Sequence, residues 1–226
     1  FGFSKMFIIS AILMLFLFIP SSKIKSTKLF HFPITHYLQD FKNKKILYFC
    51  LVVFIFSLHF GAEHVAYSPF VKQNLGLDLL STAYYLASVV VFLLIGSIYA
   101  GKMIDKGINR VKIMRYSMLL SGLGGFLFAS TNNVFLSWIF RSLHELGDGA
   151  FLVMISIGIF NLFDKKRVGG NSGFVNLVII ISSFIGSLIF GPLGYRLGYQ
   201  WPHIISGALA ILAFFMILFL KRKTSL

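Results

Sequence analysis

The feature that most constrains this chain is a series of seven long apolar runs separated by shorter polar segments. The runs cover approximately residues 4–20, 46–68, 80–100, 112–130, 134–163, 172–194 and 203–220. A helix needs about 20 apolar residues to cross a bilayer, and in lipid every backbone group must be paired within a helix or a closed barrel. The runs are too continuous for barrel strands, which alternate apolar and polar residues. The sequence therefore predicts an all-α membrane protein with seven transmembrane helices.

Composition excludes the other broad classes. Of the 226 residues, 57% are hydrophobic and only 12% are charged, whereas soluble domains carry about 25% charged residues and disordered chains have low hydrophobicity. A net charge of +14 could indicate a nucleic-acid partner, but so apolar a chain has too little polar surface for that role. We therefore expect the lipid bilayer as a partner and no nucleic acid.

The basic residues predict the orientation. Seventeen of the 21 Lys and Arg residues fall on one side of the predicted spans and three on the other, while Arg141 lies within a run. The segments on the richer side are 21–45, 102–115, 165–167 and 221–223. Because cytoplasmic loops carry the excess of Lys and Arg, we expect an outside N-terminus and a cytoplasmic C-terminus, in the cell (plasma) membrane.

The first run has two interpretations. Residues 1–20 resemble a secretory signal peptide, with a lysine before an apolar core, but cleavage would leave the six lysines of residues 21–45 on the outer side. We therefore favour a transmembrane helix at 1–20. Residues 21–45 form the longest polar stretch and predict a cytoplasmic linker, and residues 46–223 predict a six-helix transmembrane bundle.

The loop between the third and fourth runs contains Gly101, Asp105, Lys106, Gly107 and Arg110. Glycine permits a tight turn, and Asp105 can lie near a helix N-terminus, where negative charge is favoured. The loop resembles the G-x-x-x-D-R-x-G-R-R loop of the major facilitator superfamily, with Lys106 in place of the arginine and the second glycine one position earlier. The resemblance implies a gating role; an ordinary positive-inside loop is the alternative.

Two further segments are similar to the same family. Gly186, Gly191, Pro192 and Gly194, in the sixth run, resemble the glycine-proline element of the family's fifth or eleventh helix, where small residues allow close helix packing. A packing kink without a switching role is the alternative. The segment from Arg141 to Gly149 is similar to the arginine- and glycine-containing helix at the family's fourth and tenth positions.

This resemblance covers residues 46–220 by order, spacing and topology. It implies that the first run matches the sixth helix of the family, residues 21–45 the central loop, and the other runs helices seven to twelve. We therefore expect a C-terminal half that works with a missing N-terminal six-helix half. A complete N-terminal half with one additional leading helix is the competing register.

Charged side chains at membrane depth cost about 2.5–3.5 kcal/mol each, so they are functional candidates. Arg141, Glu145 and Asp148 follow the spacing i, i+4, i+7, and at about 1.5 Å per residue they bracket the midplane. In the second run His59, Glu63 and Tyr67 share one face. The resemblance implies that both runs line the central cavity. The expected cavity residues are His59, Glu63, His64, Tyr67, Arg141, His144, Glu145 and Asp148.

These residues predict a secondary active transporter that moves a small solute by alternating access. A carboxyl group beside an arginine in an apolar cavity can load and release a proton, so we expect transport to be coupled to protons. We expect no enzyme activity, cofactor or metal. Arg141 and Glu145 could instead simply neutralise each other. A non-transporting scaffold or receptor is the first alternative function. An intramembrane metalloenzyme is the second, although Asp148 stands where H-E-x-x-H has its second histidine.

Overall fold

The computed structural model describes residues 3–23 and 33–220, and these form two units that are treated separately. The first unit contains helix α1 (Phe3–Ser22), with Pro20 near its end. Residues 4–22 of this helix are long and apolar enough to cross a membrane.

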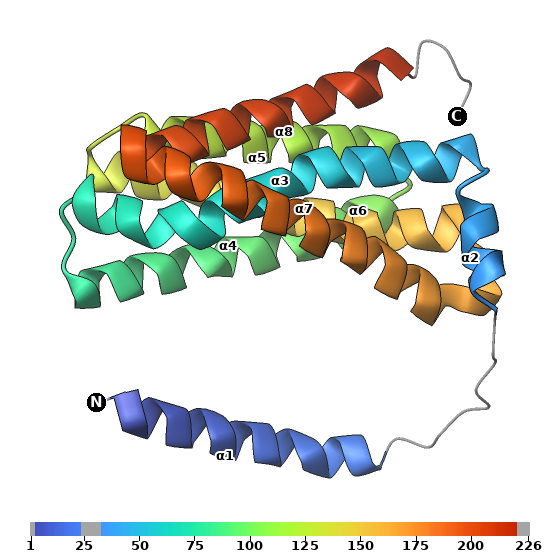
Figure 1. Ribbon diagram of the computed structural model, residues 1–226, viewed down its shortest axis with the longest axis horizontal. Helices are drawn as coiled ribbons and strands as arrows, with labels where there is room; N and C mark the ends of the chain where they lie inside the picture. Colours follow the sequence, from blue (N-terminus) through green and yellow to red (C-terminus); the bar gives the residue numbers. More distant parts are fainter. Residues whose placement is uncertain (1–2, 24–32, 221–226) are drawn as a thin grey trace. The chain divides into compact units, whose positions relative to one another are not determined.

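The second unit is a bundle of six long helices with two short helical segments (Figure 1). Its elements are α2 (Ile34–Asp40), α3 (Lys44–Gln73), α4 (Leu79–Asp105), α5 (Arg110–Ala129), α6 (Val134–Leu162), η1 (Lys165–Arg167), α7 (Val168–Leu197) and α8 (Gln200–Leu220). The alternation of direction places α2, the α4–α5 turn and η1 at one end of the bundle, which we call the basic end.

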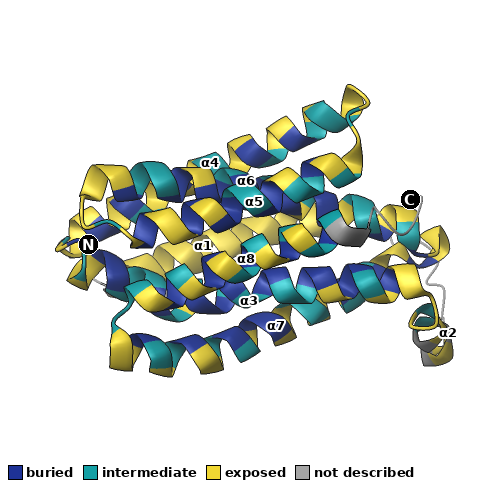
Figure 2. Cartoon of the chain, turned by 90° about the horizontal axis from the view of Figure 1, so that it is seen from above, coloured by how far each residue is buried: buried dark blue, intermediate teal, exposed yellow. Residues whose placement is uncertain are grey.

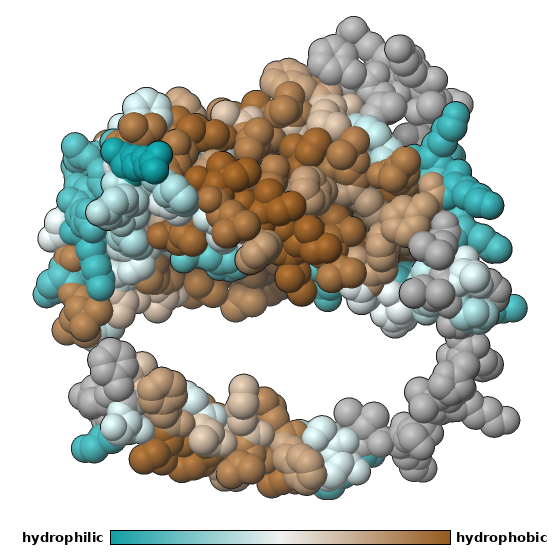
Figure 3. All heavy atoms as spheres, in the orientation of Figure 1, coloured by the Kyte–Doolittle hydropathy of each residue, from teal (hydrophilic) through white to brown (hydrophobic). Residues whose placement is uncertain are grey.

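Within the described residues there are seven long helices, and six of them are apolar and long enough to cross a membrane: α1, α3, α4, α6, α7 and α8. The remaining one, α5, begins with Arg110, Lys112 and Arg115, which lower its mean hydropathy. It packs along α6 and α8, so we assign it as the seventh span. Figure 3 shows the bundle with an apolar belt between two more polar ends, as a bilayer requires. The chain is an integral, multi-pass, all-α membrane protein.

Short polar side chains begin the helices at the turns. Asn109 accepts a hydrogen bond from the Lys112 N–H, and Asn133 accepts one from the Leu136 N–H, which are N-caps that satisfy otherwise unpaired donors. Gly107 has φ +77°, a left-handed conformation that glycine adopts without strain. It therefore allows α4 and α5 to be joined by only four residues, 106–109.

Close glycine contacts hold the long helices together. Helix α3 packs along α7 and α8, whereas α6 packs along α4 and α5. A Cβ on Gly147 of α6 would stand 2.5 Å from the Ser121 nitrogen of α5. A Cβ on Gly186 of α7 would collide with the Leu58 carbonyl of α3. Since neither pair of backbones could approach so closely with a larger residue, these glycines set the spacing of the bundle core, which is coloured dark blue in Figure 2.

Several predicted boundaries and contacts differ from the structure. Helices α3 and α7 are longer than the apolar runs that predicted them, since both continue through polar residues at their ends. Asp105 is the last residue of α4, and the side chain of Asn109 caps the first turn of α5. In the stretches 3–23 and 33–220, no ion pair includes Asp105.

Candidate functional site

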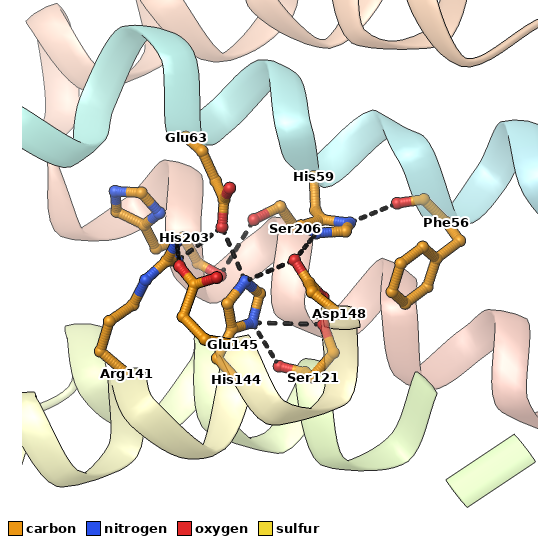
Figure 4. Close-up of polar contacts among 10 residues, drawn as sticks. All are labelled: Phe56, His59, Glu63, Ser121, Arg141, His144, Glu145, Asp148, His203 and Ser206. Carbon is orange, nitrogen blue, oxygen red and sulfur yellow. Dashed lines mark hydrogen bonds and ion pairs between the residues drawn. The ribbon is translucent and has the colours of Figure 1, made fainter. Parts of the chain in front are cut away.

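Helices α3 and α6 bring six ionisable side chains together in the middle of the bundle (Figure 4). We call these residues the central cluster: His59, Glu63, Arg141, His144, Glu145 and Asp148. Their helical spacing explains the arrangement, because the α6 members recur about one turn apart on one face. Only 2% of the Arg141 side chain is exposed, and 17% of the Glu63 side chain. Access to the cluster is therefore greatest at Glu63.

Arg141 joins the two helices. Its Nη1 donates to Glu63 Oε1 at 2.5 Å, and its Nη2 donates to Glu145 Oε1 at 2.6 Å. The guanidinium also lies 4.1 Å from the centre of the Tyr67 ring, a geometry that favours a cation–π interaction. The pairing of Arg141 with Glu63 connects α6 to α3, and Glu145 supplies a second carboxylate from the same helix as Arg141.

Two histidines form the other half of the cluster. His144 Nε2 lies 2.6 Å from Glu63 Oε1 and 3.3 Å from Asp148 Oδ2. His59 Nε2 lies 3.1 Å from the same Asp148 oxygen. Asp148 therefore stands between an imidazole of α3 and an imidazole of α6, and its second oxygen, Oδ1, is buried with no hydrogen-bond partner among the described residues.

Backbone carbonyls fix the orientation of both imidazole rings. His59 Nδ1 donates to the Phe56 carbonyl at 2.5 Å, and His144 Nδ1 donates to the Ser121 carbonyl at 2.7 Å. A carbonyl oxygen only accepts hydrogen bonds, so Nδ1 carries the proton in each ring. The other ring nitrogen, Nε2, faces the carboxylates in both histidines.

The sequence reasoning missed Ser121, which orients His144 from α5. Ser121 lies in a run of small residues and carries no charge that would have marked it as a site residue. His203 of α8 was also missed, although it is buried, with its ring 6.1 Å from the Tyr67 ring. A histidine at the start of the seventh run was the available signal.

Not every predicted cavity residue joins the cluster. His64 is exposed, and its Nδ1 lies 3.1 Å from Ser183 Oγ of α7. Tyr67 borders the cluster through its ring alone, and its hydroxyl group has no hydrogen-bond partner in the described part of the chain. Consecutive residues of a helix point in different directions, which explains why His64 diverges from Glu63.

The predicted gating residues lie at the basic end of the bundle, and the predicted switch residues lie within α7. Gly101 and Asp105 lie in the last turns of α4, Lys106 is its C-cap, and Arg110 begins α5. The four switch residues all lie within α7: Gly186, Gly191, Pro192 and Gly194. Gly186 approaches the α3 backbone, whereas Gly191 has only Val65 near it.

The cluster lies inside the six-helix bundle. A pocket of about 460 Å³ lies elsewhere, between α4, α5 and α6 near the basic end, and its lining residues are almost all apolar and include no member of the cluster. Burial in an apolar interior strengthens each electrostatic contact, and it also makes each unpaired charge costly. The cluster can therefore hold cations or protons among three carboxyl groups, with Arg141 as a permanent counter-charge.

These observations define a polytopic membrane protein with an ionisable site at mid-depth in a six-helix bundle. The sequence profile of the Major Facilitator Superfamily matches residues 88–225, and the chain belongs to this family. The chain is also 28% identical over 138 residues to Multidrug resistance protein 3 of Bacillus subtilis (strain 168). That match covers 60% of this chain and 26% of the relative, so the chain spans well under two thirds of that protein's length.

Proposed function

We propose that this chain is part of a secondary active transporter that moves a small solute across the membrane by alternating access. The observation that carries the proposal is the central cluster, because buried ionisable residues in membrane helices mark ion and substrate pathways. Family membership and a relative named for multidrug resistance support the same class of protein. A transporter of this kind needs no enzyme activity.

The proposal includes coupling to protons. Each imidazole donates Nδ1–H to a backbone carbonyl while its Nε2 lies 3.3 Å or less from a carboxylate oxygen. A hydrogen bond between Nε2 and such an oxygen needs a proton on one of the two atoms. This geometry supports the storage of one proton in each His–carboxylate pair. Arg141 would then release Glu63 or Glu145 as the two halves of the transporter rock.

The other predicted residues would have gating and packing roles in this transport cycle. We propose that Asp105, Lys106 and Arg110 gate the basic end, with Gly101 giving α4 room to move. The glycine-proline element of α7, around Gly191 and Pro192, would adjust the packing of α7 on α3 during the conformational change. The bundle would act with an N-terminal six-helix half, with its C-terminus in the cytoplasm of a plasma-membrane protein.

Reconstitution of the natural polypeptide that contains this chain tests the proposal. Uptake of radiolabelled sugars, amino acids and organic cations into proteoliposomes is measured with and without an inward proton gradient. We expect gradient-driven uptake of at least one solute, with coupling lost in Asp148→Asn and Glu63→Gln. His64→Gln is the control, since this histidine faces α7. Uptake that is unchanged in both cluster variants would contradict the roles assigned to these carboxyl groups.

Drug export is a second candidate function, supported by the 28% identity to Multidrug resistance protein 3. Its test is the accumulation of the cationic dye ethidium in cells that express the natural polypeptide. Lower accumulation than in cells expressing the Arg141→Met variant would support export. Equal accumulation, with both proteins present in the membrane, would exclude ethidium as a solute.

A further inference from the structure

We propose that His59, Glu63, His144 and Asp148 form a binding site for one divalent transition-metal ion. Each offers one ligand atom, and the four atoms lie within 4.8 Å of one another. The sequence alone predicted no metal here, because neither helix carries a complete zinc motif. The set becomes visible only when α3 and α6 pack together and each contributes one histidine and one carboxylate (Figure 4).

The distances suit a metal after small movements of the side chains. Ligand atoms about 2.0–2.2 Å from a metal ion stand about 3 Å apart when they are adjacent in its coordination shell. The Asp148 oxygen lies 3.1 Å from His59 Nε2 and 3.3 Å from His144 Nε2. Glu63 Oε1 and His144 Nε2 are closer, at 2.6 Å, so that Glu63 has to withdraw by a few tenths of an ångström. Glu63 is the most exposed of the four, and it has the room to do so.

The hydrogen bonds around the site prepare its histidines for a metal. Metal-binding histidines donate their other ring N–H to a carboxylate or a backbone carbonyl, which fixes the tautomer and the ring orientation. His59 and His144 both do so, to the carbonyls of Phe56 and Ser121. Their Nε2 lone pairs therefore point to the space between the two carboxylates.

A buried and unpartnered oxygen gives an independent indication of a ligand. Asp148 Oδ1 has no hydrogen-bond partner among the described residues, and only 2% of this side chain is exposed. A buried polar atom without a partner has lost its hydrogen bonds to water without replacing them, which costs stability. A metal ion bound by Asp148 would use this second oxygen for bidentate coordination and remove that cost.

Charge and donor chemistry identify the class of metal. With neutral imidazoles the four ligands carry two negative charges, and Arg141 with Glu145 carries none in total. One divalent ion therefore leaves the whole cluster neutral, as a buried site requires. Two imidazoles exclude the all-oxygen sites of Mg²⁺ and Ca²⁺, and a set without thiolates disfavours Cu⁺. The mixed set fits Mn²⁺, Fe²⁺, Co²⁺ or Zn²⁺.

The ion is best placed as the transported solute. His59 and Asp148 lie midway along α3 (44–73) and α6 (134–162), and solute sites of secondary transporters lie near the bilayer midplane. This assignment as cargo rests on the proposed function, whereas metal binding itself does not. The two protons of the proposed coupling carry the same charge as one divalent ion, so that the two occupants exclude each other.

Titration with Co²⁺ tests the site. The purified protein in detergent, without an affinity tag and after treatment with a chelator, is titrated at pH 7.5 while its visible absorption is recorded. We expect one Co²⁺ per chain, with absorption bands typical of a nitrogen- and oxygen-ligated ion. We further expect Co²⁺ to raise the Tm of the protein. Asp148→Asn and His59→Gln should each weaken binding at least tenfold.

His64→Gln is the matched control, because His64 lies on the same helix but faces Ser183. It should bind Co²⁺ as the natural protein does. Circular dichroism and gel filtration establish that each variant is folded, and the effect of Co²⁺ on Tm gives a second reading for any variant of lowered stability. A folded natural protein without saturable binding overturns the inference, and so do ligand variants that bind Co²⁺ as tightly as the natural protein does.

Transport assays separate the two levels of the proposal. Uptake of a solute other than a metal, with no saturable Co²⁺ binding, would overturn the metal site and leave the transporter intact. Tight Co²⁺ binding in proteoliposomes that take up neither ⁵⁴Mn²⁺ nor any other solute would overturn the transporter and leave the metal site intact.

Discussion

The bundle contains two arginine–carboxylate networks that differ in their surroundings. In the centre, Arg141 binds Glu63 and Glu145, and 2% of its side chain is exposed. At the basic end, Arg167 binds Asp40 through two parallel contacts of 3.0 and 3.1 Å and approaches Asp164 at 3.5 Å. The side chain of Asp164 is 46% exposed, so this second network is in contact with water.

The difference favours the central network, and not the one at the basic end, as the proposed functional site. The network at the basic end ties α2 to the start of α7. Its Arg167 and Asp40 side chains are 7% and 17% exposed, and Asp164 at its edge is open to water. The central network lies at bilayer depth, where charged groups are rare unless function requires them. It has three carboxyl groups and two histidines around one arginine, far more than helix packing needs. This contrast supports the proposal that the central network handles the ion or solute.

The largest loss of stability is expected from Arg141→Met, which leaves Glu63 and Glu145 without their counter-charge in the bundle interior. Removing one partner of a buried ion pair costs about 3–5 kcal/mol. We expect a large fall in the temperature at which the detergent-solubilised protein aggregates, measured by gel filtration after heating. The exposed Arg196 provides the control, since Arg196→Met should change little.

A triple variant sharpens this first test. Adding Glu63→Gln and Glu145→Gln to Arg141→Met removes the unpaired charges, and replacing a whole buried network is far less costly than breaking it. Partial recovery of stability is therefore expected. If the triple variant were no more stable than Arg141→Met, the loss would come from packing and not from uncompensated charge.

The second largest effect is expected at Gly147, which lets α5 lie against α6 beside the cluster. A Cβ at this position would stand 2.5 Å from the Ser121 nitrogen and 2.6 Å from the Ser117 carbonyl. Gly147→Ala would therefore push Ser121 away from His144, at a cost of about 1–3 kcal/mol for an overpacked core. Gly173→Ala is the matched control, because no atom lies within 4 Å of a Cβ there. Equal melting temperatures for the two variants would contradict the assigned contact.

The fold could be predicted from the sequence because the bilayer imposes a single requirement on every span. Long apolar runs were enough to predict the seven long helices, and membership of the family that the sequence resembles is confirmed. The boundaries were less accurate, since Asn43 and Asn109 cap helices that continue beyond the apolar residues. Local capping is not visible in hydropathy alone.

The candidate site could be predicted only in part. Charges in apolar runs single out Arg141 and Glu63 by their cost in lipid, but the contact between them depends on how α3 and α6 pack. The supporting contact of Ser121 with His144 depends on how closely α5 approaches α6, which no periodicity within one helix reveals. The orientation of His64 away from the cluster depends in the same way on the packing of α3 against α7.

A smaller effect is expected from Arg167→Met at the basic end. This arginine makes two contacts with Asp40 and its side chain is 7% exposed, but the neighbouring Asp164 is open to water at the end of the bundle. Water and salt therefore screen part of this network, so the loss should be smaller than that of Arg141→Met. Raising NaCl from 0.05 to 1 M should reduce the difference from the natural protein, because the Debye length shortens to about 3 Å at 1 M. The loss of stability caused by Arg141→Met should change much less with salt. Equal salt dependence of the two variants would remove the distinction between the networks.

The smallest effect is expected from Asp164→Asn, which keeps a side-chain oxygen to cap η1 but removes the charge. The backbone N–H of Lys166 donates to this carboxylate and lowers its pKa, and Arg167 adds to the effect. A carboxyl group with a lowered pKa in the folded state stabilises the protein above its unfolded pKa of about 4, and this contribution is lost as the pH falls through the folded value. The natural protein should therefore melt slightly above Asp164→Asn at pH 7, and the two curves should converge as the pH is lowered to about 3. A difference that grew on acidification would show that the charge of Asp164 opposes folding, and the basic end would then owe its stability to the Arg167–Asp40 pair alone.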